Sequence, residues 1–115
     1  MMNLNLNSDI YDLVIHSDTL EHIPDVIKGL SECKRVLKKE DHCIFTAPII
    51  INRLTRSRNG LKKSFHGSPT NKLDDHLVYT EFGSDIWKYP LEAGFSNVKI
   101  HMLEYRAGLA LEVTK

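Results

Sequence analysis

The sequence lacks the features that place a chain in a membrane or send it out of the cell. It contains no run of about 18 apolar residues, the length that a membrane-spanning helix requires. The first seven residues, MMNLNLN, carry neither a basic region nor a continuous apolar stretch, so they do not form a recognisable secretory signal. We therefore expect a cytoplasmic protein that makes no contact with a membrane.

Cysteine is scarce, and neither sign of charge is in excess. Cys33 and Cys43 are the two cysteines, and neither belongs to a CxxC pair or a metal-spaced quartet, so we expect buried, reduced thiols. Fifteen Lys and Arg balance fifteen Asp and Glu, giving a formal net charge of zero. This balance argues against a surface built for nucleic acid or for an anionic membrane.

The composition is that of an ordinary folded domain. Of the 115 residues, 42% are hydrophobic and 26% are charged, close to the globular averages of about 45% and about 25%. A chain of this length forms one hydrophobic core. We expect a single domain over residues 1–115.

The first half of the chain has the pattern of a strand, a helix and a second strand. Three consecutive apolar residues within 11–17 predict a strand that is buried on both faces, as in a parallel sheet. A helix follows, begun by Pro24 and Asp25. Its apolar stripe consists of Val26, Leu30, Cys33 and Leu37. A second buried strand is expected at 42–47, ended by Pro48.

The second half begins with an irregular segment. Residues 49–73 contain turn signals and no acidic residue, and predict a long basic loop or lid. A helix is expected within 80–93, closed by Gly94, and Pro90 predicts a kink or an early stop in it. Alternating apolar residues within 98–114 predict an antiparallel hairpin at a sheet edge.

Residues 11–25, with the sequence YDLVIHSDTLEHIPD, resemble the fourth-strand motif of class I S-adenosylmethionine-dependent methyltransferases. That motif has a Tyr/Phe-Asp start, a strand, then Leu-Glu-His-Ile/Val and an acidic residue that opens a helix. The segments RVLK at 35–38 and LEAGF at 91–95 are similar to two further phrases of the family. The resemblance implies the C-terminal half of a Rossmann-like methyltransferase sheet, in the order β-α-β-loop-α-β-β, ending in an antiparallel hairpin.

The chain departs from the family pattern at its start. The family begins with a strand and a glycine-rich turn that approach the methionine part of the cofactor, and a second strand ends in an acid that holds the ribose. No GxG motif lies in the first ten residues. We therefore expect a partial domain without roughly the first three strands and their helices.

The resemblance also implies a site and S-adenosylmethionine as cofactor. The residues expected at the methionyl end of the cofactor are Ser17, Asp18 and Leu20. His22 is expected to face the methyl-transfer region and to act as a catalytic base, because histidine titrates near neutral pH. His66 and His76 are the expected substrate-binding residues.

Two other interpretations of the Leu-Glu-His segment remain open. In the first, His22 and Asp25 do no more than hydrogen-bond the exposed N-terminus of the helix. In the second, Asp18, Glu21 and His22 form a divalent-metal cluster, as a similar acid-x-x-Glu-His group does in some relatives. A fourth ligand could come from His66 or His76, but spacing alone cannot place either residue in the site. Because members that bind no metal also carry Glu-His, we expect no metal here.

Three functions are consistent with the sequence. The first is S-adenosylmethionine-dependent methyl transfer to an unidentified acceptor by a truncated form, whose activity as an isolated chain stays open. The second is a non-catalytic module whose strand edge at 13–15 pairs with a second copy, giving a homo-oligomer, or with a complementary N-terminal half. The third is an anion or RNA binder that uses the basic segment 53–72, which the neutral total charge disfavours; a solvated loop is the simpler interpretation of that segment.

Overall fold

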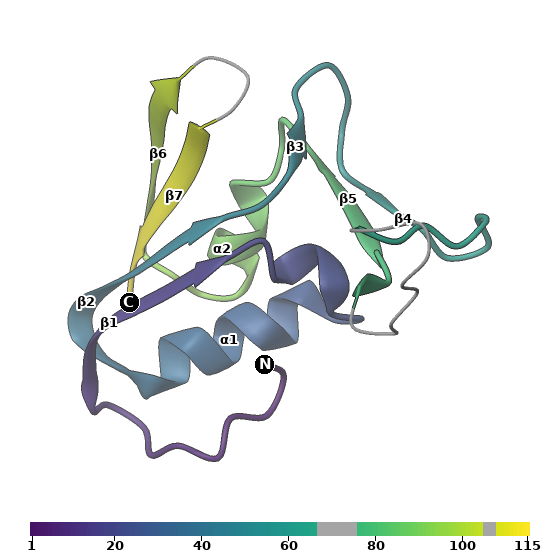
Figure 1. Cartoon of the computed structure of the whole chain (residues 1–115). Coiled ribbons are helices and arrows are strands. Elements are labelled where there is room, and N and C mark those ends of the chain that lie inside the picture. Colours follow the sequence, from purple (N-terminus) through teal and green to yellow (C-terminus); the bar gives the residue numbers. More distant parts are fainter. Residues whose placement is uncertain (67–75, 105–107) are drawn as a thin grey trace.

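The computed structural model describes residues 1–66, 76–104 and 108–115, with positions 103 and 104 described by their backbone. Its main sheet has four strands in the order β1-β2-β7-β6 (Figure 1). Strand β1 (Tyr11–Ser17) pairs parallel with β2 (Leu37–Thr46). Strands β6 (Asn97–Glu104) and β7 (Gly108–Thr114) are antiparallel, and β7 pairs antiparallel with β2. The expected mixed fold with a final hairpin is confirmed.

Strand β2 begins five residues earlier than the sequence predicted. Tyr11 is opposite Leu37 and Leu13 is opposite His42, so the two strands contain an irregularity at this point. Glu40, inside it, has a φ of 67°. Residues 38–41 therefore form a bulge within a strand that begins at Leu37, since pairing with β1 is present on both sides of them.

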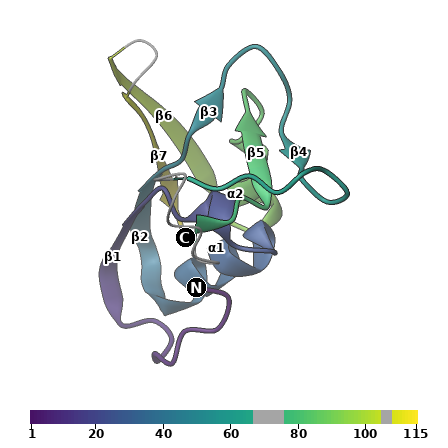
Figure 2. The same cartoon turned by 45° about the vertical axis from the view of Figure 1, so that its right-hand side comes forward.

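Helix α1 (Val26–Val36) covers one face of this sheet, as Figures 1 and 2 show. Asp25 caps it, because its carboxylate accepts a hydrogen bond of 2.9 Å from the backbone N–H of Lys28. The buried helix residues Leu30 and Cys33 pack in one core with the inward-facing side chains of β2 and β7. Those strand residues are Cys43, Phe45, Leu111 and Val113. Val26, Leu30 and Cys33 of the predicted stripe thus lie in this core, whereas the fourth member, Leu37, is the first residue of β2 and not part of the helix.

A smaller sheet of three strands stands beside the main one (Figure 2). Its order is β3 (Ile49–Ile50), β5 (Thr80–Gly83) and β4 (Arg56–Ser57). The expectation of one helix over 80–93 is wrong in its first part, because β5 occupies these positions and α2 is confined to Lys88–Glu92. Strands β3 and β4 supply the pairing that turns residues 80–83 into a strand, and neither was predicted from the sequence.

Helix α2 shows how its proline and glycine act. Pro90 is the third residue of the helix, where its missing N–H removes no intrahelical hydrogen bond. The predicted kink is therefore absent, and the helix begins just before the proline. Gly94 has a φ of 91° and follows the end of the helix, which confirms its predicted role as a terminator.

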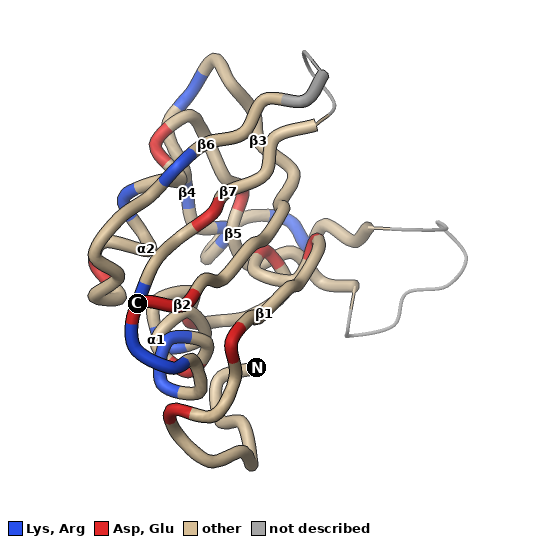
Figure 3. Tube along the Cα trace, turned by 90° about the vertical axis from the view of Figure 1, so that its left-hand side faces the viewer, with Lys and Arg blue, Asp and Glu red and all other residues tan. Residues whose placement is uncertain are grey.

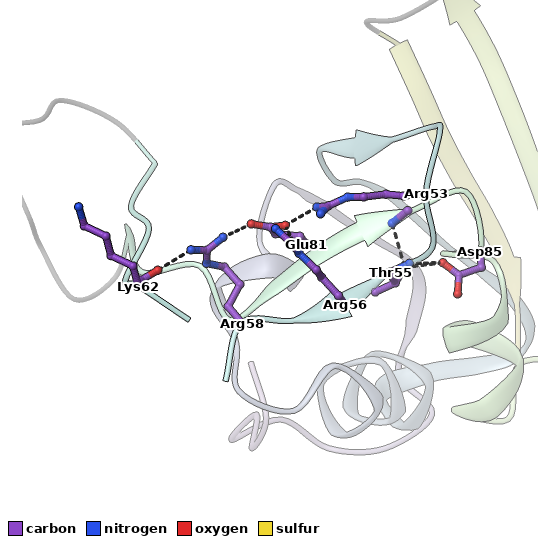
Figure 4. A network of polar contacts seen from close by, with 8 residues as sticks. Arg53, Thr55, Arg56, Arg58, Lys62, Glu81 and Asp85 are labelled. Carbon is purple, nitrogen blue, oxygen red and sulfur yellow. Dashed lines mark hydrogen bonds and ion pairs between the residues drawn. The ribbon is translucent and has the colours of Figure 1, made fainter. Parts of the chain in front are cut away.

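Three arginines of the basic segment share one acid from β5. Arg53, Arg56 and Arg58 all contact the carboxylate of Glu81, with Arg56 Nε at 2.7 Å (Figure 4). Arg53 first, and then the other two guanidinium groups, lower the pKa of Glu81 to about 2. The basic segment therefore has its counter-charge in a strand that is distant in sequence.

A second acid, Asp85, fixes the loop before β4. Both the backbone N–H and the hydroxyl of Thr55 donate to Oδ1 of Asp85 at 2.7 Å (Figure 4). Lys88 pairs with the other oxygen at 2.7 Å and is the main reason that the pKa of Asp85 is depressed. Figure 3 shows basic and acidic residues scattered over the trace of the described residues. None of the described helices has the length and apolar character of a membrane span.

Candidate functional site

The candidate site begins where β1 and β2 end side by side. Ser17 is the last residue of β1 and Thr46 is the last of β2, and their hydroxyl oxygens lie 2.7 Å apart. The hydroxyl of Ser17 also donates to Oδ2 of Asp18 at 3.0 Å. Ligands of open α/β sheets bind at the carboxyl ends of parallel strands. The structure therefore places Ser17 and Asp18 at the edge of the sheet where the sequence expected them.

Asp18 turns the chain sharply out of β1. Its φ is 46°, in the left-handed region that few residues other than glycine adopt. The backbone N–H of Asp18 donates to the carbonyl of Thr46 at 3.1 Å, which holds the turn against β2. The side chain of Asp18 is exposed, so its carboxylate faces solvent beside the strand ends.

A single 3-10 turn, η1 (Leu20–His22), follows and holds three residues in different environments. Leu20 is 1% exposed and belongs to the core, so any contact it makes with a ligand comes from its backbone. Glu21 is also 1% exposed, although it carries a carboxylate. The side chain of His22 is partly buried between this carboxylate and residue 77.

The carboxylate of Glu21 lies between two histidines. Oε1 of Glu21 is 3.6 Å from Nε2 of His22 and 3.6 Å from Nδ1 of His66. The two imidazole rings meet edge to face with centroids 5.0 Å apart. Both carboxylate oxygens of Glu21 are buried and have no hydrogen-bond partner among the described residues. Burial is the main cause of the raised pKa of Glu21.

The proton on His22 is positioned by a backbone carbonyl. Nδ1 of His22 lies 3.0 Å from the carbonyl oxygen of Leu77, and a carbonyl can only accept, so Nδ1 donates. In the neutral ring this leaves the lone pair on Nε2, the nitrogen that faces Glu21. A lone pair and a carboxylate repel each other unless a proton or a cation lies between them. The arrangement therefore suits proton transfer, and its one carboxylate and two imidazoles are also a donor set for a divalent metal ion.

Backbone pairing brings the later histidines to this place. Phe65 and Leu77 form an antiparallel bridge, and the N–H of His66 donates to the carbonyl of His76 at 3.0 Å. The N–H of Tyr79 donates to the carbonyl of Glu21 at 2.7 Å, which attaches the pair of segments to η1. His66 reaches the Glu21 carboxylate, whereas His76 is joined to it through the backbone of His66. Nδ1 of His76 is buried without a hydrogen-bond partner among the described residues.

The structure gives Asp25 and His22 different hydrogen-bond partners, although one interpretation of the sequence had both at the helix N-terminus. Asp25 caps α1, as the capping interpretation held, but His22 directs Nδ1 to Leu77 and not to the helix N-terminus. The carbonyl of Leu77 was not foreseen, because a backbone acceptor leaves no signal in the sequence. The sequence grouped Asp18, Glu21 and His22, and the structure brings together Glu21, His22 and His66.

A cavity of about 390 Å³ is lined by Pro24 and by residues 57–63 and 77–80, and neither His22 nor His66 is among its lining residues. Its walls include Leu77, whose carbonyl orients His22, and Pro24, which follows η1. The basic residues Arg58, Lys62 and Lys63 line it from the other side. Arg58 is held by Glu81 and by the carbonyl of Lys62, so part of this positive charge is already compensated (Figure 4).

The comparisons with known proteins find similarity to methyltransferases. Residues 1–45 match the family model described as a methyltransferase domain. Over 99% of this chain, the structure resembles a SAM-dependent methyltransferase, possible histamine N-methyltransferase, from Thermotoga maritima, with a TM-score of 0.58 and 17% identity. The chain has a class I methyltransferase fold. A search of the curated proteins found no match.

Two other methyltransferase structures share this fold over 99% of the chain. A putative O-methyltransferase from Nostoc punctiforme has a TM-score of 0.62 and 16% identity. The 1,6-didemethyltoxoflavin-N1-methyltransferase from Burkholderia thailandensis, solved with its substrate and S-adenosylhomocysteine, has a TM-score of 0.60 and 16% identity. The chain spans 60% of the Thermotoga protein, 34% of the Nostoc protein and 47% of the Burkholderia protein.

Proposed function

We propose that this chain forms the part of an S-adenosylmethionine-dependent methyltransferase site that holds the methionyl end of the cofactor and takes the proton from the methyl acceptor. The observation that carries the proposal is the position of His22. Its Nδ1 donates to the carbonyl of Leu77, and its Nε2 faces the carboxylate of Glu21. His22 is the last residue of η1, the single turn that follows Ser17 and Asp18 at the end of β1.

The residues at the strand end fit the charge of this cofactor. S-adenosylmethionine supplies a methyl group on a cationic sulfur, and its methionyl end also carries an ammonium group. The exposed carboxylate of Asp18 and the hydroxyl of Ser17 are acceptors, which favour such cations. Leu20 adds a backbone contact, since its side chain is in the core.

His22 acts as the base. Nε2 takes the proton from the hydroxyl or amine of the acceptor as its oxygen or nitrogen bonds to the methyl carbon, and the electrons of the carbon–sulfur bond stay with sulfur. The carboxylate of Glu21, 3.6 Å from Nε2, stabilises the imidazolium that results. His66, on the same oxygen, and His76, joined to it by the backbone, form the acceptor side.

The test is binding of S-adenosylhomocysteine to the 115-residue chain, followed by NMR. We expect selective shifts of the amide signals of Ser17, Asp18 and Leu20 with an affinity in the millimolar range, because the sequence contains no GxG turn. The variant Asp18→Asn should weaken these shifts. The matched control is Asp12→Asn, a change at the opposite end of β1, where Asp12 pairs with Lys38.

Two results would count against this proposal. Shifts that are absent, or that lie away from the strand end, would remove the cofactor from this site. Equal losses in both aspartate variants would point to a general charge effect. Micromolar affinity would instead overturn our expectation that binding needs a glycine-rich turn that these residues do not supply.

The edge of β1 favours a second function, that of a non-catalytic module that self-associates. β1 is an edge strand of the main sheet, with no neighbour on its outer side among the described residues. Leu13 and Ile15 on this strand are 46% and 68% exposed. An unpaired strand with apolar side chains is a template for pairing with another chain. The same edge would accept a complementary segment that carries the rest of a methyltransferase sheet.

Sedimentation equilibrium of the purified chain tests this second function. We expect a reversible dimer, and we expect Ile15→Lys to weaken dimerisation about tenfold or more, because it places a charge on the pairing edge. Ile100→Lys on β6 is the control, since Ile100 is 52% exposed but lies on the opposite edge strand. A chain that stays monomeric at all concentrations, or equal effects of both variants, would exclude the β1 edge as the interface.

A further inference from the structure

A second group of ligand-type side chains lies inside the fold, between the main sheet and helix α1. It consists of His16 on β1, Cys33 on α1 and Cys43 on β2. One imidazole nitrogen and the two sulfur atoms lie within 4.8 Å of one another. Cys33 is 1% exposed and Cys43 is 0% exposed. The two cysteines are therefore enclosed and His16 is partly buried. Three elements that are separate in sequence build the group.

His16 has no hydrogen-bond partner that explains its position. Both ring nitrogens are buried and unpartnered among the described residues. The ring is held in place by stacking on Phe45, with centroids 5.1 Å apart and planes 8° from parallel. Buried imidazole nitrogens in folded proteins normally bond to a protein group, to water or to a metal. Packing on Phe45 thus fixes the ring of His16, while both ring nitrogens have no hydrogen bond among the described residues.

The two cysteines complete a donor set for a soft metal ion. Cys33 and Cys43 are both free and buried, and their sulfur atoms lie within the same group. A cysteine binds a metal ion as the thiolate, so binding would release the thiol protons. Sulfur and imidazole donors select ions such as Zn(II) over Mg(II) or Ca(II), which prefer oxygen.

We propose that His16, Cys33 and Cys43 form a buried binding site for a thiophilic divalent cation of the Zn(II) class. Two thiolates and one neutral imidazole around a dication give a site of zero net charge, which burial in a core requires. In a tetrahedral zinc site, ligand atoms lie roughly 3.5–3.8 Å apart, so small side-chain rotations close the group from its present spacing. Three protein ligands leave the fourth position open.

The site would join α1 to both parallel strands. Cys33 comes from the helix, while His16 and Cys43 come from the sheet face that the helix covers. A bound ion therefore stabilises the packing of α1 on β1 and β2 through direct bonds. The proposal is independent of methyl transfer, because none of its three residues belongs to the group around Glu21.

The test is titration of the reduced 115-residue chain with Co(II) in the absence of oxygen. Co(II) bound to thiolate absorbs in the near ultraviolet, and its visible bands report tetrahedral geometry. We expect one equivalent to bind, Zn(II) to displace it, and Zn(II) to raise the thermal midpoint. Cys33→Ala and Cys43→Ala should each weaken Co(II) binding by about a hundredfold, and His16→Gln by about tenfold or more.

The matched control is His66→Gln, which removes a ligand-type side chain from the other cluster and should leave the thiolate absorption intact. Circular dichroism checks that each variant folds. If a cysteine variant does not fold, His16→Gln still tests the proposed site. It keeps both thiols, and the loss of the imidazole ligand should change the visible bands of bound Co(II). No thiolate absorption, unchanged affinity in His16→Gln, or loss of the band in His66→Gln would overturn the site.

Discussion

Gly83→Ala should lower the free energy of unfolding by about 2–4 kcal/mol, because no space exists for a side chain at this position. A Cβ on Gly83 would lie 2.1 Å from the carbonyl oxygen of Arg53 and 2.6 Å from the backbone nitrogen of Thr55. These are backbone atoms of a loop that crosses directly over β5. The clash therefore cannot be relieved by rotating a side chain.

Hydrogen bonds also fix the loop at residues 53–55 in this position, so it does not move away easily. Gly83 N–H donates to the hydroxyl of Thr55 at 2.9 Å, and the backbone N–H and hydroxyl of Ser84 donate to the carbonyl of Arg53 at 2.9 and 3.1 Å. Asp85 anchors Thr55 through two further hydrogen bonds. Displacing the loop breaks several of these contacts, each worth about 0.5–1.5 kcal/mol.

Thermal unfolding followed by circular dichroism measures this effect. For a chain of this size we expect the midpoint to fall by about 10 °C or more. Gly29→Ala is the control, because its nearest neighbour is Cδ1 of Ile23, the mobile end of a side chain, at 2.3 Å. Alanine also favours the helix there by up to about 1 kcal/mol, so the net change should be small. A midpoint in Gly83→Ala equal to that of the unmodified chain would show that the loop yields.

Glu21→Gln should stabilise the protein at neutral pH by about 1–2 kcal/mol, while it removes the group that we assign to stabilising the imidazolium of His22. Both oxygens of Glu21 are buried without partners among the described residues. The charged carboxylate is therefore disfavoured in the folded chain, and its pKa is raised, chiefly by burial. A neutral amide avoids this penalty, and its N–H groups suit the lone pair that His22 presents.

The pH dependence gives the sign of this effect. Because the folded pKa of Glu21 is raised above the unfolded value of about 4.5, the folded chain binds more protons in the window between the two. The contribution of Glu21 to stability is therefore present below the unfolded pKa and is lost as pH rises through the folded pKa. Denaturant unfolding at several pH values should show this loss in the unmodified chain and not in Glu21→Gln.

Glu32→Gln is the control, because its expected change in stability at neutral pH is opposite in sign to that of Glu21→Gln. Arg35, first among its neighbours, lowers the pKa of Glu32 to about 2. The contribution of Glu32 to stability is present above about pH 4.5 and is lost as pH falls toward 2. Glu32→Gln should therefore have a lower free energy of unfolding at neutral pH, and its stability should change less with pH in the acid range. A lower stability of Glu21→Gln at neutral pH would contradict our view that the Glu21 charge is uncompensated.

The elements that local patterns encode were predictable. The strand over 11–17 followed from three consecutive apolar residues and the final hairpin from alternating ones, and the structure contains both. The predicted burial of the first strand on both faces is wrong, because β1 is an edge strand of the described sheet and exposes Leu13 and Ile15. Asp25 was recognisable as a helix start because capping involves residues three positions apart. The place of Ser17 and Asp18 at the end of β1 was also predictable, since it follows from where the strand ends, and their contact with a cofactor stays a prediction.

The elements that depend on distant partners were not predictable. Residues 80–83 contain apolar positions that suit a helix, but pairing with β3 on one side and β4 on the other makes them a strand. The bulge near Glu40 arises because β1 and β2 must stay in register around it. Neither partner strand is longer than two residues, so neither has a periodic signal of its own.

By itself, the sequence determined the strand–helix–strand unit, the hairpin and the residues at the end of the first strand, because each is specified by neighbours within a few positions. The tertiary structure decided which side chains meet. It set His66 beside Glu21 and His22, and it enclosed Cys33 and Cys43 with His16. The physical reason is that these contacts depend on strand register and on backbone hydrogen bonds between distant segments, and the order of residues along a chain does not contain either as a local pattern.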